Sequence, residues 1–205
     1  MGIVTIIHLV RHGRVENPKG VIYGRLPGYH LSELGLEQAR LAAERLADRD
    51  VGTIWASPLE RAQETAAIIA APHGLEIVTD DRLTESATTM EGATRTLLGL
   101  LRDPLRWWHF RNPLRPSWGE SFTEVRARML EAVNAAVVAA GDKEAVIVSH
   151  QTPVLVARFG LGGRRVPPLA GLVACDTGSI TTITLEGGRV RSTAYFSPPQ
   201  ASAGR

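Results

Sequence analysis

The stretch of sequence that decides the fold is Ile3-Val4-Thr5-Ile6-Ile7-His8-Leu9-Val10-Arg11-His12-Gly13. Its first eight residues are mostly apolar and β-branched, and the run ends at a charged pair followed by glycine. Such a run is typical of a buried strand that leads into a loop. In open α/β sheets, ligands bind beyond the carboxyl ends of the strands. We therefore expect Arg11 and His12 at the mouth of a crevice.

Predicted helices and strands alternate along the rest of the chain. Helical spacing of apolar residues predicts helices over residues 33–49, 58–71, 120–140 and 152–160, the first of them capped by Ser32. Apolar runs predict strands over residues 53–57, 76–78 and 144–150, followed by an antiparallel group over 172–175, 179–185 and 189–196. This order predicts an α/β fold, a three-layer α/β/α sandwich around a mostly parallel central sheet.

The chain is expected to form a single domain over residues 1–196. Its 205 residues are enough for one core, and no repeat or linker divides them. Residues 14–30 form a long polar loop, and loops of this length are more often functional than idle. Residues 197–205 are polar and terminal, and we expect a disordered tail there.

Residues 88–118 are the least regular part of the sequence. A short helical pattern over residues 93–102 gives way to prolines and to the aromatic side chains Trp107, Trp108, Phe110 and Trp118. Two interpretations stay open. The aromatic groups either pack against the side of the domain, or they form a lid over the ligand-binding edge that selects the substrate.

Composition excludes several classes of function. The 23 basic and 21 acidic residues give a net charge of +2 without a Lys/Arg-rich run, so nucleic-acid binding is not indicated. No apolar run approaches the roughly 20 residues of a membrane span. The apolar N-terminus lacks the basic region of a signal peptide. Cys175 is the only cysteine, which predicts a cytoplasmic protein without intramolecular disulfides.

Four polar clusters lie at predicted strand ends or helix starts. They are Arg11-His12, Ser57-Pro58-Leu59-Glu60-Arg61, Leu83-Thr84-Glu85 and Val148-Ser149-His150. A parallel sheet would bring their two histidines, two arginines and carboxylate to one edge. Guanidinium groups match phosphate oxygens, a neutral imidazole can attack phosphorus, and a carboxyl group can protonate the leaving oxygen. The pattern indicates phosphoryl chemistry.

These motifs, in this order over residues 6–155, resemble the histidine phosphatase superfamily, whose fold is phosphoglycerate mutase-like. The resemblance rests on Leu-Val-Arg-His-Gly, Ser-Pro-Leu-x-Arg-Ala-x-Glu-Thr-Ala, Leu-x-Glu and Val-Ser-His. It implies that His12 is the nucleophile and becomes phosphohistidine, and that Glu85 is the proton donor. It implies that Arg11, Arg61 and His150 complete the phosphate pocket, and that neither a metal nor a cofactor is needed. Asn17, Tyr23 and Gly24 of the long loop are further candidate substrate contacts.

Three departures from the family pattern concern residues beside this set. Arg14 and Val15 stand where the family often has Glu and a hydroxyl residue. Asn17 is one residue closer to His12 than usual, and Gln151 replaces a common glycine. The five proposed catalytic residues match.

The function expected from these observations is hydrolysis of a small phosphomonoester through phosphohistidine. Two alternatives stay open: phosphoglycerate mutase-type phosphoryl transfer, and a module that binds or senses a phosphorylated ligand with little turnover. A phosphoprotein substrate and a homodimer are also left open. The short chain and the departures at Arg14 and Val15 favour hydrolysis over mutase activity.

Several single residues also have simpler structural roles to consider. A carboxylate such as Glu85 often interacts with a helix N-terminus instead of substrate. Ser57 is expected to cap the helix that follows Pro58. His8 is expected to pack inside its strand, and His30, His73 and His109 are expected at the surface.

Overall fold

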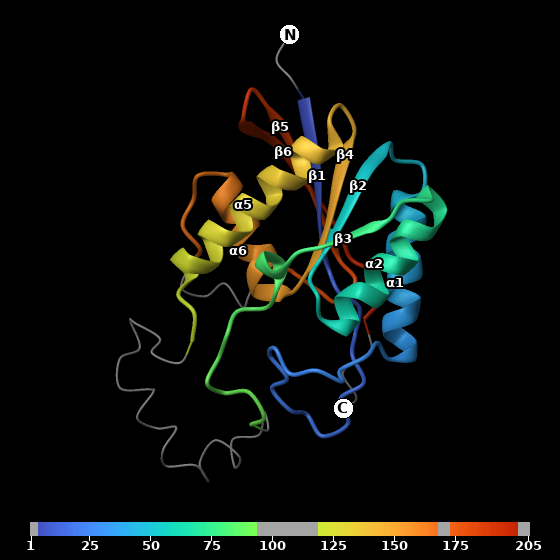
Figure 1. Ribbon diagram of the computed structural model, residues 1–205, viewed down its shortest axis with the longest axis vertical. Helices are drawn as coiled ribbons and strands as arrows, with labels where there is room; N and C mark the ends of the chain where they lie inside the picture. Colours follow the sequence, from blue (N-terminus) through green and yellow to red (C-terminus); the bar gives the residue numbers. More distant parts are fainter. Residues whose placement is uncertain (1–3, 94–118, 168–172, 201–205) are drawn as a thin grey trace.

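The computed structural model describes residues 4–93, 119–167 and 173–200 and contains a six-stranded sheet in the order β3-β2-β4-β1-β5-β6 (Figure 1). The strands are β1 (Val4–Arg11), β2 (Val51–Ala56), β3 (Ile77–Thr79), β4 (Glu144–Ser149), β5 (Ile180–Glu186) and β6 (Arg189–Phe196). Strands β1 to β4 pair in parallel, whereas β5 and β6 are antiparallel additions at one edge. The predicted mostly parallel sheet is therefore confirmed.

Helices cover both faces of this sheet (Figure 1). They are α1 (Glu33–Leu46), α2 (Glu60–Ala70), α5 (Phe122–Ala140) and α6 (Gln151–Leu161). Apolar residues of α1 and α2 form one core cluster with Val10, while those of α5 and α6 form another with Ile7 and Leu9. Successive side chains of a strand point to opposite faces, so β1 contributes to both cores. This arrangement confirms the three-layer α/β/α prediction.

The central position of β1 fixes the ligand-binding edge. Its residues Ile7, Leu9 and Val10 are fully buried between β4 and β5. Arg11 is in register with Ser149, so the Arg11-His12 and Ser149-His150 pairs leave the sheet side by side. In Figure 1 these strand ends point downward, toward the loop of residues 14–30 (blue) and the segment after β3 (green).

The described C-terminal region differs from prediction in two places. Residues 173–175 form no strand, and residues 168–172 lie outside the described part of the chain. Instead, a turn precedes β5, in which the Gly178 N–H donates to the carbonyl oxygens of Arg11 and His12. Residues 197–200 of the expected tail contact the domain, because Gln38 donates to Pro199 O at 3.1 Å and Gln200 donates to Thr177 O at 3.1 Å. Residues 201–205 of that tail lie outside the described residues.

Smaller differences concern element ends. Helix α1 ends at Leu46, and α2 begins at Glu60 with Leu59 as its N-cap. Ser32 caps α1 as predicted, since its hydroxyl accepts from the Gly35 N–H at 3.1 Å. The expected helix over 93–102 and most of the irregular segment 88–118 lie outside the described residues. Within the described ranges, no helix is long and apolar enough to cross a membrane.

Candidate active site

The structure brings the five predicted catalytic residues to the carboxyl edge of the sheet. His12 follows β1, and His150 follows β4 as the N-cap of α6. Arg61 lies in the first turn of α2, and all three side chains are buried. The ring centroids of His12 and His150 are 5.0 Å apart. Glu85 follows the short 3-10 helix η2 (Asp81–Leu83) and is half-buried.

The His12 ring is held in one orientation. Its Nδ1–H donates to the carbonyl oxygen of Gly13 at 2.7 Å, and among the described residues Nε2 has no hydrogen-bond partner, so its lone pair is available. Burial lowers the pKa of His12 well below its ordinary value, and the positive charges of Arg11 and Arg61 lower it further. The imidazole is therefore neutral at neutral pH, the form in which Nε2 is a nucleophile.

Two glycines hold the loop after His12 against the first turn of α1. A Cβ atom on Gly13 would lie 2.4 Å from the carbonyl oxygen of Gly35. A Cβ atom on Gly35 would lie 2.0 Å from the carbonyl oxygen of Arg14. Both positions therefore require glycine because two main-chain segments approach closely. The Gly13 N–H also donates to the Thr65 hydroxyl of α2 at 3.1 Å, which ties the same loop to a second helix.

Each of the two arginines binds a main-chain carbonyl group through one guanidinium nitrogen. Each also keeps at least one other buried guanidinium nitrogen without a partner among the described residues. Arg11 Nη1 donates to the carbonyl oxygen of Cys175 at 2.6 Å, and Arg61 Nη2 donates to that of Gly24 at 2.6 Å. Among the described residues, the buried Nε of Arg11 and the buried Nε and Nη1 of Arg61 have no hydrogen-bond partner. A buried donor without a partner costs about 1–3 kcal/mol. Such donors fit the oxygens of an anion, and arginine suits phosphate in particular.

His150 offers a further donor to the same site. Its Nε2 lies 2.8 Å from the Ser57 hydroxyl, and its buried Nδ1 has no partner among the described residues. With the hydroxyl donating to Nε2, Nδ1 carries the ring proton and can donate to an anion. Burial lowers the pKa of His150 well below its ordinary value, and the electrostatic effect of His12 lowers it further. The predicted capping role of Ser57 is wrong, because α2 is capped at Leu59 and Ser57 contacts His150.

Glu85 has the properties of a proton donor. Its carboxylate accepts from the Ser86 N–H at 2.8 Å. Burial raises its pKa, although the Ser86 N–H and the charges of Arg11 and Arg61 oppose this rise. A carboxyl group with a raised pKa keeps its proton closer to neutral pH and can give it to a leaving oxygen.

The three other candidate residues lie on the loop of residues 14–30. The Tyr23 ring lies 4.8 Å beneath the Arg61 guanidinium, and the Gly24 carbonyl oxygen binds the same group. The Asn17 side chain both donates to Val21 O at 2.8 Å and accepts from its N–H at 3.0 Å, which closes the loop on itself. Asn17 and Tyr23 also line a cavity of about 480 Å³.

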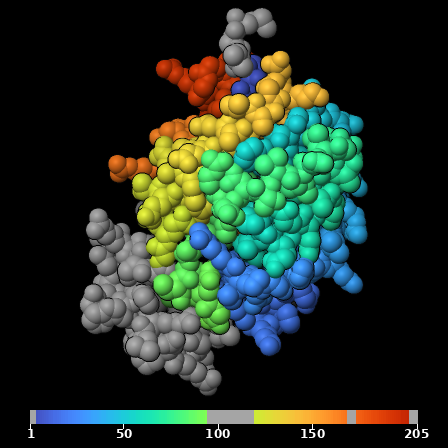
Figure 2. Space-filling view, viewed as in Figure 1, coloured from blue at the N-terminus to red at the C-terminus, as the bar shows by residue number. Residues whose placement is uncertain are grey.

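This cavity adjoins Arg11 and is mostly polar. Its lining includes Arg11, Arg14, Asn17, Tyr23, Thr177 and Gln200. The loop of residues 14–30 (blue) and the segment of residues 80–93 (green) lie side by side at the same edge (Figure 2). Two backbone hydrogen bonds join them, from Ile22 to Ala93 and from Gly92 to Ile22.

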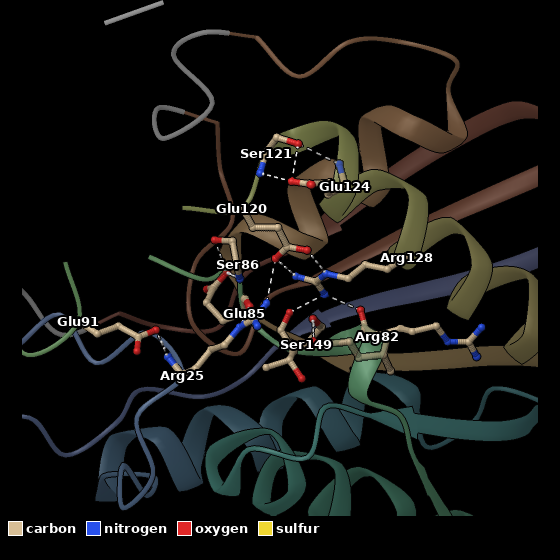
Figure 3. Close-up of polar contacts among 12 residues, drawn as sticks. Arg25, Arg82, Glu85, Ser86, Glu91, Glu120, Ser121, Glu124, Arg128 and Ser149 are labelled. Atoms are coloured by element: carbon tan, nitrogen blue, oxygen red, sulfur yellow. Dashed lines mark hydrogen bonds and ion pairs between the residues drawn. The ribbon is translucent and has the colours of Figure 1, made fainter. Parts of the chain in front are cut away.

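Arg25, Glu120 and Arg128 form a cluster that sequence reasoning missed (Figure 3). Arg128 lies on α5 and donates to main-chain oxygens of the segment that carries Glu85. These two carbonyl partners are more than forty residues away in sequence. No side-chain pattern in the sequence could have indicated these contacts.

The remaining histidines have varied surroundings. His8 is buried, as predicted, and His30 is exposed beside Glu64. His73 is half-buried, and its Nε2 has no partner among the described residues. His109 lies outside the described residues. In residues 4–93, 119–167 and 173–200, no group of three or more His, Cys, Asp or Glu side chains could hold a metal ion.

Comparison with known proteins gives the following similarities. A family model described as the histidine phosphatase superfamily (branch 1) matches residues 7–197. The chain is 47% identical over 195 residues to the uncharacterized protein Rv0525 of Mycobacterium tuberculosis, covering 95% of this chain and 96% of that protein. It is 33% identical over 150 residues to a probable phosphoglycerate mutase, GpmB, of Yersinia pestis, covering 70% and 68%. The solved mycobacterial glucosyl-3-phosphoglycerate phosphatase Rv2419c has a TM-score of 0.74 at 27% identity, covering 95% and 97%.

Proposed function

The chain belongs to the histidine phosphatase superfamily (branch 1), with its phosphoglycerate mutase-like fold, and we propose that it hydrolyses small phosphomonoesters through a phosphohistidine at His12. One observation carries the proposal. Near a neutral His12, the side chains of Arg11, Arg61 and His150 keep buried donors that have no partner among the described residues, and the His12 Nε2 accepts no hydrogen bond from those residues. Donors of this kind stabilise the charge on phosphoryl oxygens during transfer.

In the first step, the His12 Nε2 attacks phosphorus while the bond from phosphorus to the leaving oxygen breaks. Arg11, Arg61 and His150 donate hydrogen bonds to the three remaining phosphoryl oxygens. The proton on Glu85 passes to the leaving oxygen, so the alcohol departs neutral.

In the second step, a water molecule attacks the phosphohistidine. The Glu85 carboxylate takes the proton from this water, a new bond forms between oxygen and phosphorus, and the bond between nitrogen and phosphorus breaks. Inorganic phosphate leaves, and His12 and Glu85 return to their first states. The raised pKa of Glu85 suits a group that must be an acid in one step and a base in the next.

A small, polar phosphorylated metabolite is the substrate class that we propose. The cavity of about 480 Å³ beside Arg11 has room for a group the size of a sugar, and its polar lining suits hydroxyl groups. The similarity to a phosphatase of glucosyl-3-phosphoglycerate supports a sugar-acid or sugar phosphate. A cytoplasmic location and a homodimer stay predictions from the sequence.

Phosphoglycerate mutase activity is the second candidate, favoured by the similarity to the probable mutase of Yersinia pestis. A mutase would share the first step and then return the phosphoryl group to a sugar-acid phosphate. Assays of phosphoglycerate interconversion, with and without bisphosphoglycerate, separate the two activities. Hydrolysis predicts release of phosphate that exceeds interconversion under both conditions.

The test of the proposed function is direct capture of the intermediate. Wild-type protein is mixed with a radiolabelled phosphomonoester, quenched rapidly and assayed for acid-labile, base-stable label. We expect labelled protein for wild type and none for His12→Ala. Label at equal level in His12→Ala, or phosphate release by wild type without any labelled protein, contradicts the mechanism.

A further inference from the structure

The backbone that carries Glu85 is held by side chains from three other parts of the chain (Figure 3). Each of the four carbonyl oxygens of residues 82–85 accepts a hydrogen bond from a side chain. Arg128 donates to the first and third at 2.5 and 2.7 Å. Ser149, the neighbour of His150, donates to the second at 2.6 Å, and Arg25 donates to the fourth at 2.6 Å.

The two arginines are themselves joined by one carboxylate. Glu120 accepts from Arg128 Nε at 2.7 Å and Nη2 at 2.9 Å, and its Oε2 also accepts from Arg25 at 2.9 Å. The side chains of Arg128 and Glu120 are each only 16% exposed. The hydrogen bond from Arg128 lowers the pKa of Glu120, so the carboxylate stays charged. We call Arg25, Glu120 and Arg128 the carbonyl clamp.

The held segment has little regular structure of its own to fix it. Strand β3 ends at Thr79, and η2 ends at Leu83, so residues 84 and 85 lie outside both elements. Main-chain carbonyl groups without partners in the protein would bind water instead and leave the segment free to move. Hydrogen bonds from a charged donor are roughly twice as strong as those between neutral groups. The clamp therefore fixes the main chain at the residue that acts as the acid in the proposed mechanism.

We propose that the carbonyl clamp positions the Glu85 carboxyl for proton transfer to the leaving oxygen, with Arg128 as its main positioning residue. The inference rests on the proposed function, in which Glu85 is the acid. The Glu85 proton passes to the bridging oxygen as its bond to phosphorus breaks. None of the clamp residues touches the substrate in this step.

A series of esters that differ in the basicity of the leaving group tests the proposal. An alkyl phosphate needs its leaving oxygen protonated, whereas dinitrophenolate leaves without a proton. A displacement of about 1 Å at a catalytic group can cost about 10²-fold in rate. We therefore expect Arg128→Lys and Glu120→Gln to lose about 10²-fold in the rate of phosphoenzyme formation from an alkyl phosphate. The rate of phosphoenzyme formation from dinitrophenyl phosphate, measured in a single turnover, should remain close to that of wild type. The first step is compared because the later attack of water uses Glu85 for every ester.

A double-mutant comparison separates positioning from general damage. If Arg128 acts through Glu85, then Arg128→Lys has no further effect on alkyl phosphate turnover once Glu85→Gln is present. Arg82→Lys is the matched control, because Arg82 lies on the same segment and its guanidinium pairs with Asp80. It should leave the ratio of alkyl to dinitrophenyl activity unchanged. Circular dichroism and Tm establish that each variant folds.

The outcomes distinguish the two proposals. A loss in Arg128→Lys that is uniform across the ester series, or that adds fully to the loss in Glu85→Gln, contradicts the positioning role of the clamp. The proposed function still holds in that case if wild type releases phosphate. Failure of wild type to release phosphate from any ester overturns the proposed function itself. A selective loss on alkyl phosphates that disappears in the Glu85→Gln background supports the clamp.

Discussion

His8 in β1 and His12 in the loop after β1 are both buried. They differ in the number of ring nitrogens that have a hydrogen-bond partner. His8 is bound at both, by Thr182 Oγ1 at 2.9 Å and by Glu144 Oε2 at 2.6 Å. Within the described part of the chain, His12 is bound at Nδ1 alone, by the carbonyl oxygen of Gly13. Burial is the main cause that lowers the pKa of each. Similar burial therefore gives one histidine a closed structural environment and leaves the other with a nitrogen that can react.

The charged groups around these histidines differ in the same way. Near His8, the Glu144 carboxylate also binds Arg49 through two hydrogen bonds of 2.6 and 2.8 Å, so the arginine has a charged partner. Near His12, the guanidinium groups of Arg11 and Arg61 donate to main-chain carbonyl groups and retain buried donors without partners among the described residues. Unpartnered buried donors destabilise the fold, and they are tolerated where an anion binds.

The largest expected effect is at His12. His12→Ala should lower kcat by about 10⁴-fold or more, because losing a nucleophile removes the covalent route. Steady-state phosphate release measures the loss. Residual activity within tenfold of wild type would show that the free nitrogen is not what distinguishes His12 from His8.

A smaller effect is expected at the arginines. Arg61→Lys should lower kcat by about 10²–10³-fold, since it removes donors aimed at the phosphoryl group. Arg49→Lys is the matched control, because Arg49 has its donors bound to Glu144. It should leave kcat close to wild type. Equal losses of kcat in the two variants would contradict the proposed difference between the surroundings of His12 and those of His8.

At His8 the effect should fall on stability instead of catalysis. His8→Ala leaves Thr182 and part of Glu144 without partners, and we expect the free energy of unfolding to fall by about 1–3 kcal/mol. Urea denaturation measures this change, and kcat under folded conditions should not alter. A fall in kcat at unchanged stability would assign His8 to the chemistry.

The smallest effect concerns two carboxyl groups whose pKa values move in opposite directions. Burial raises the pKa of Glu85, while Arg49 and His8 lower that of Glu144 against the effect of burial. The folded protein holds a proton on Glu85 that the unfolded chain releases, so the associated stability is complete below about pH 4.3 and is lost as pH rises through the folded pKa.

Glu85→Gln should therefore stabilise the protein at about pH 8 and have little effect at about pH 4. Thermal unfolding at the two pH values measures the difference, and 1 kcal/mol corresponds to about 2–4 °C in a domain of this size. A variant that is equally stabilised at both pH values would show that the gain does not come from the carboxylate charge.

The sequence predicted the parts of the site that follow strand ends. His12 and His150 could be placed because each follows an apolar run, and parallel strands end at one edge. The role of Ser57 could not be predicted, because its partner His150 lies 93 residues away in sequence and local helix capping was the simpler interpretation. The clamp of Arg25, Glu120 and Arg128 was missed because its partners are mostly main-chain oxygens, which carry no sequence signal.

The C-terminal region was the least predictable part of the fold. Residues 172–175 have the composition of a strand, yet Arg11 Nη1 binds the carbonyl oxygen of Cys175 and described residues 173–175 form no strand. The polar residues after β6 suggest a disordered tail, yet Gln38 of α1 donates to Pro199 O and Gln200 donates to Thr177 O, and these two contacts join residues 197–200 to the domain. In both places contacts between residues far apart in the sequence outweigh the local pattern.

The close approach of Gly13 and Gly35 limits how this protein can evolve. Each glycine faces a main-chain atom, so no change of a neighbouring side chain can make room for a larger residue at either position. Nor can a substitution at one compensate for a substitution at the other. In a comprehensive mutational library, both positions should accept glycine alone in every background. Adaptation to new substrates must then proceed through the surrounding loops, while the path of the chain after the nucleophile stays fixed.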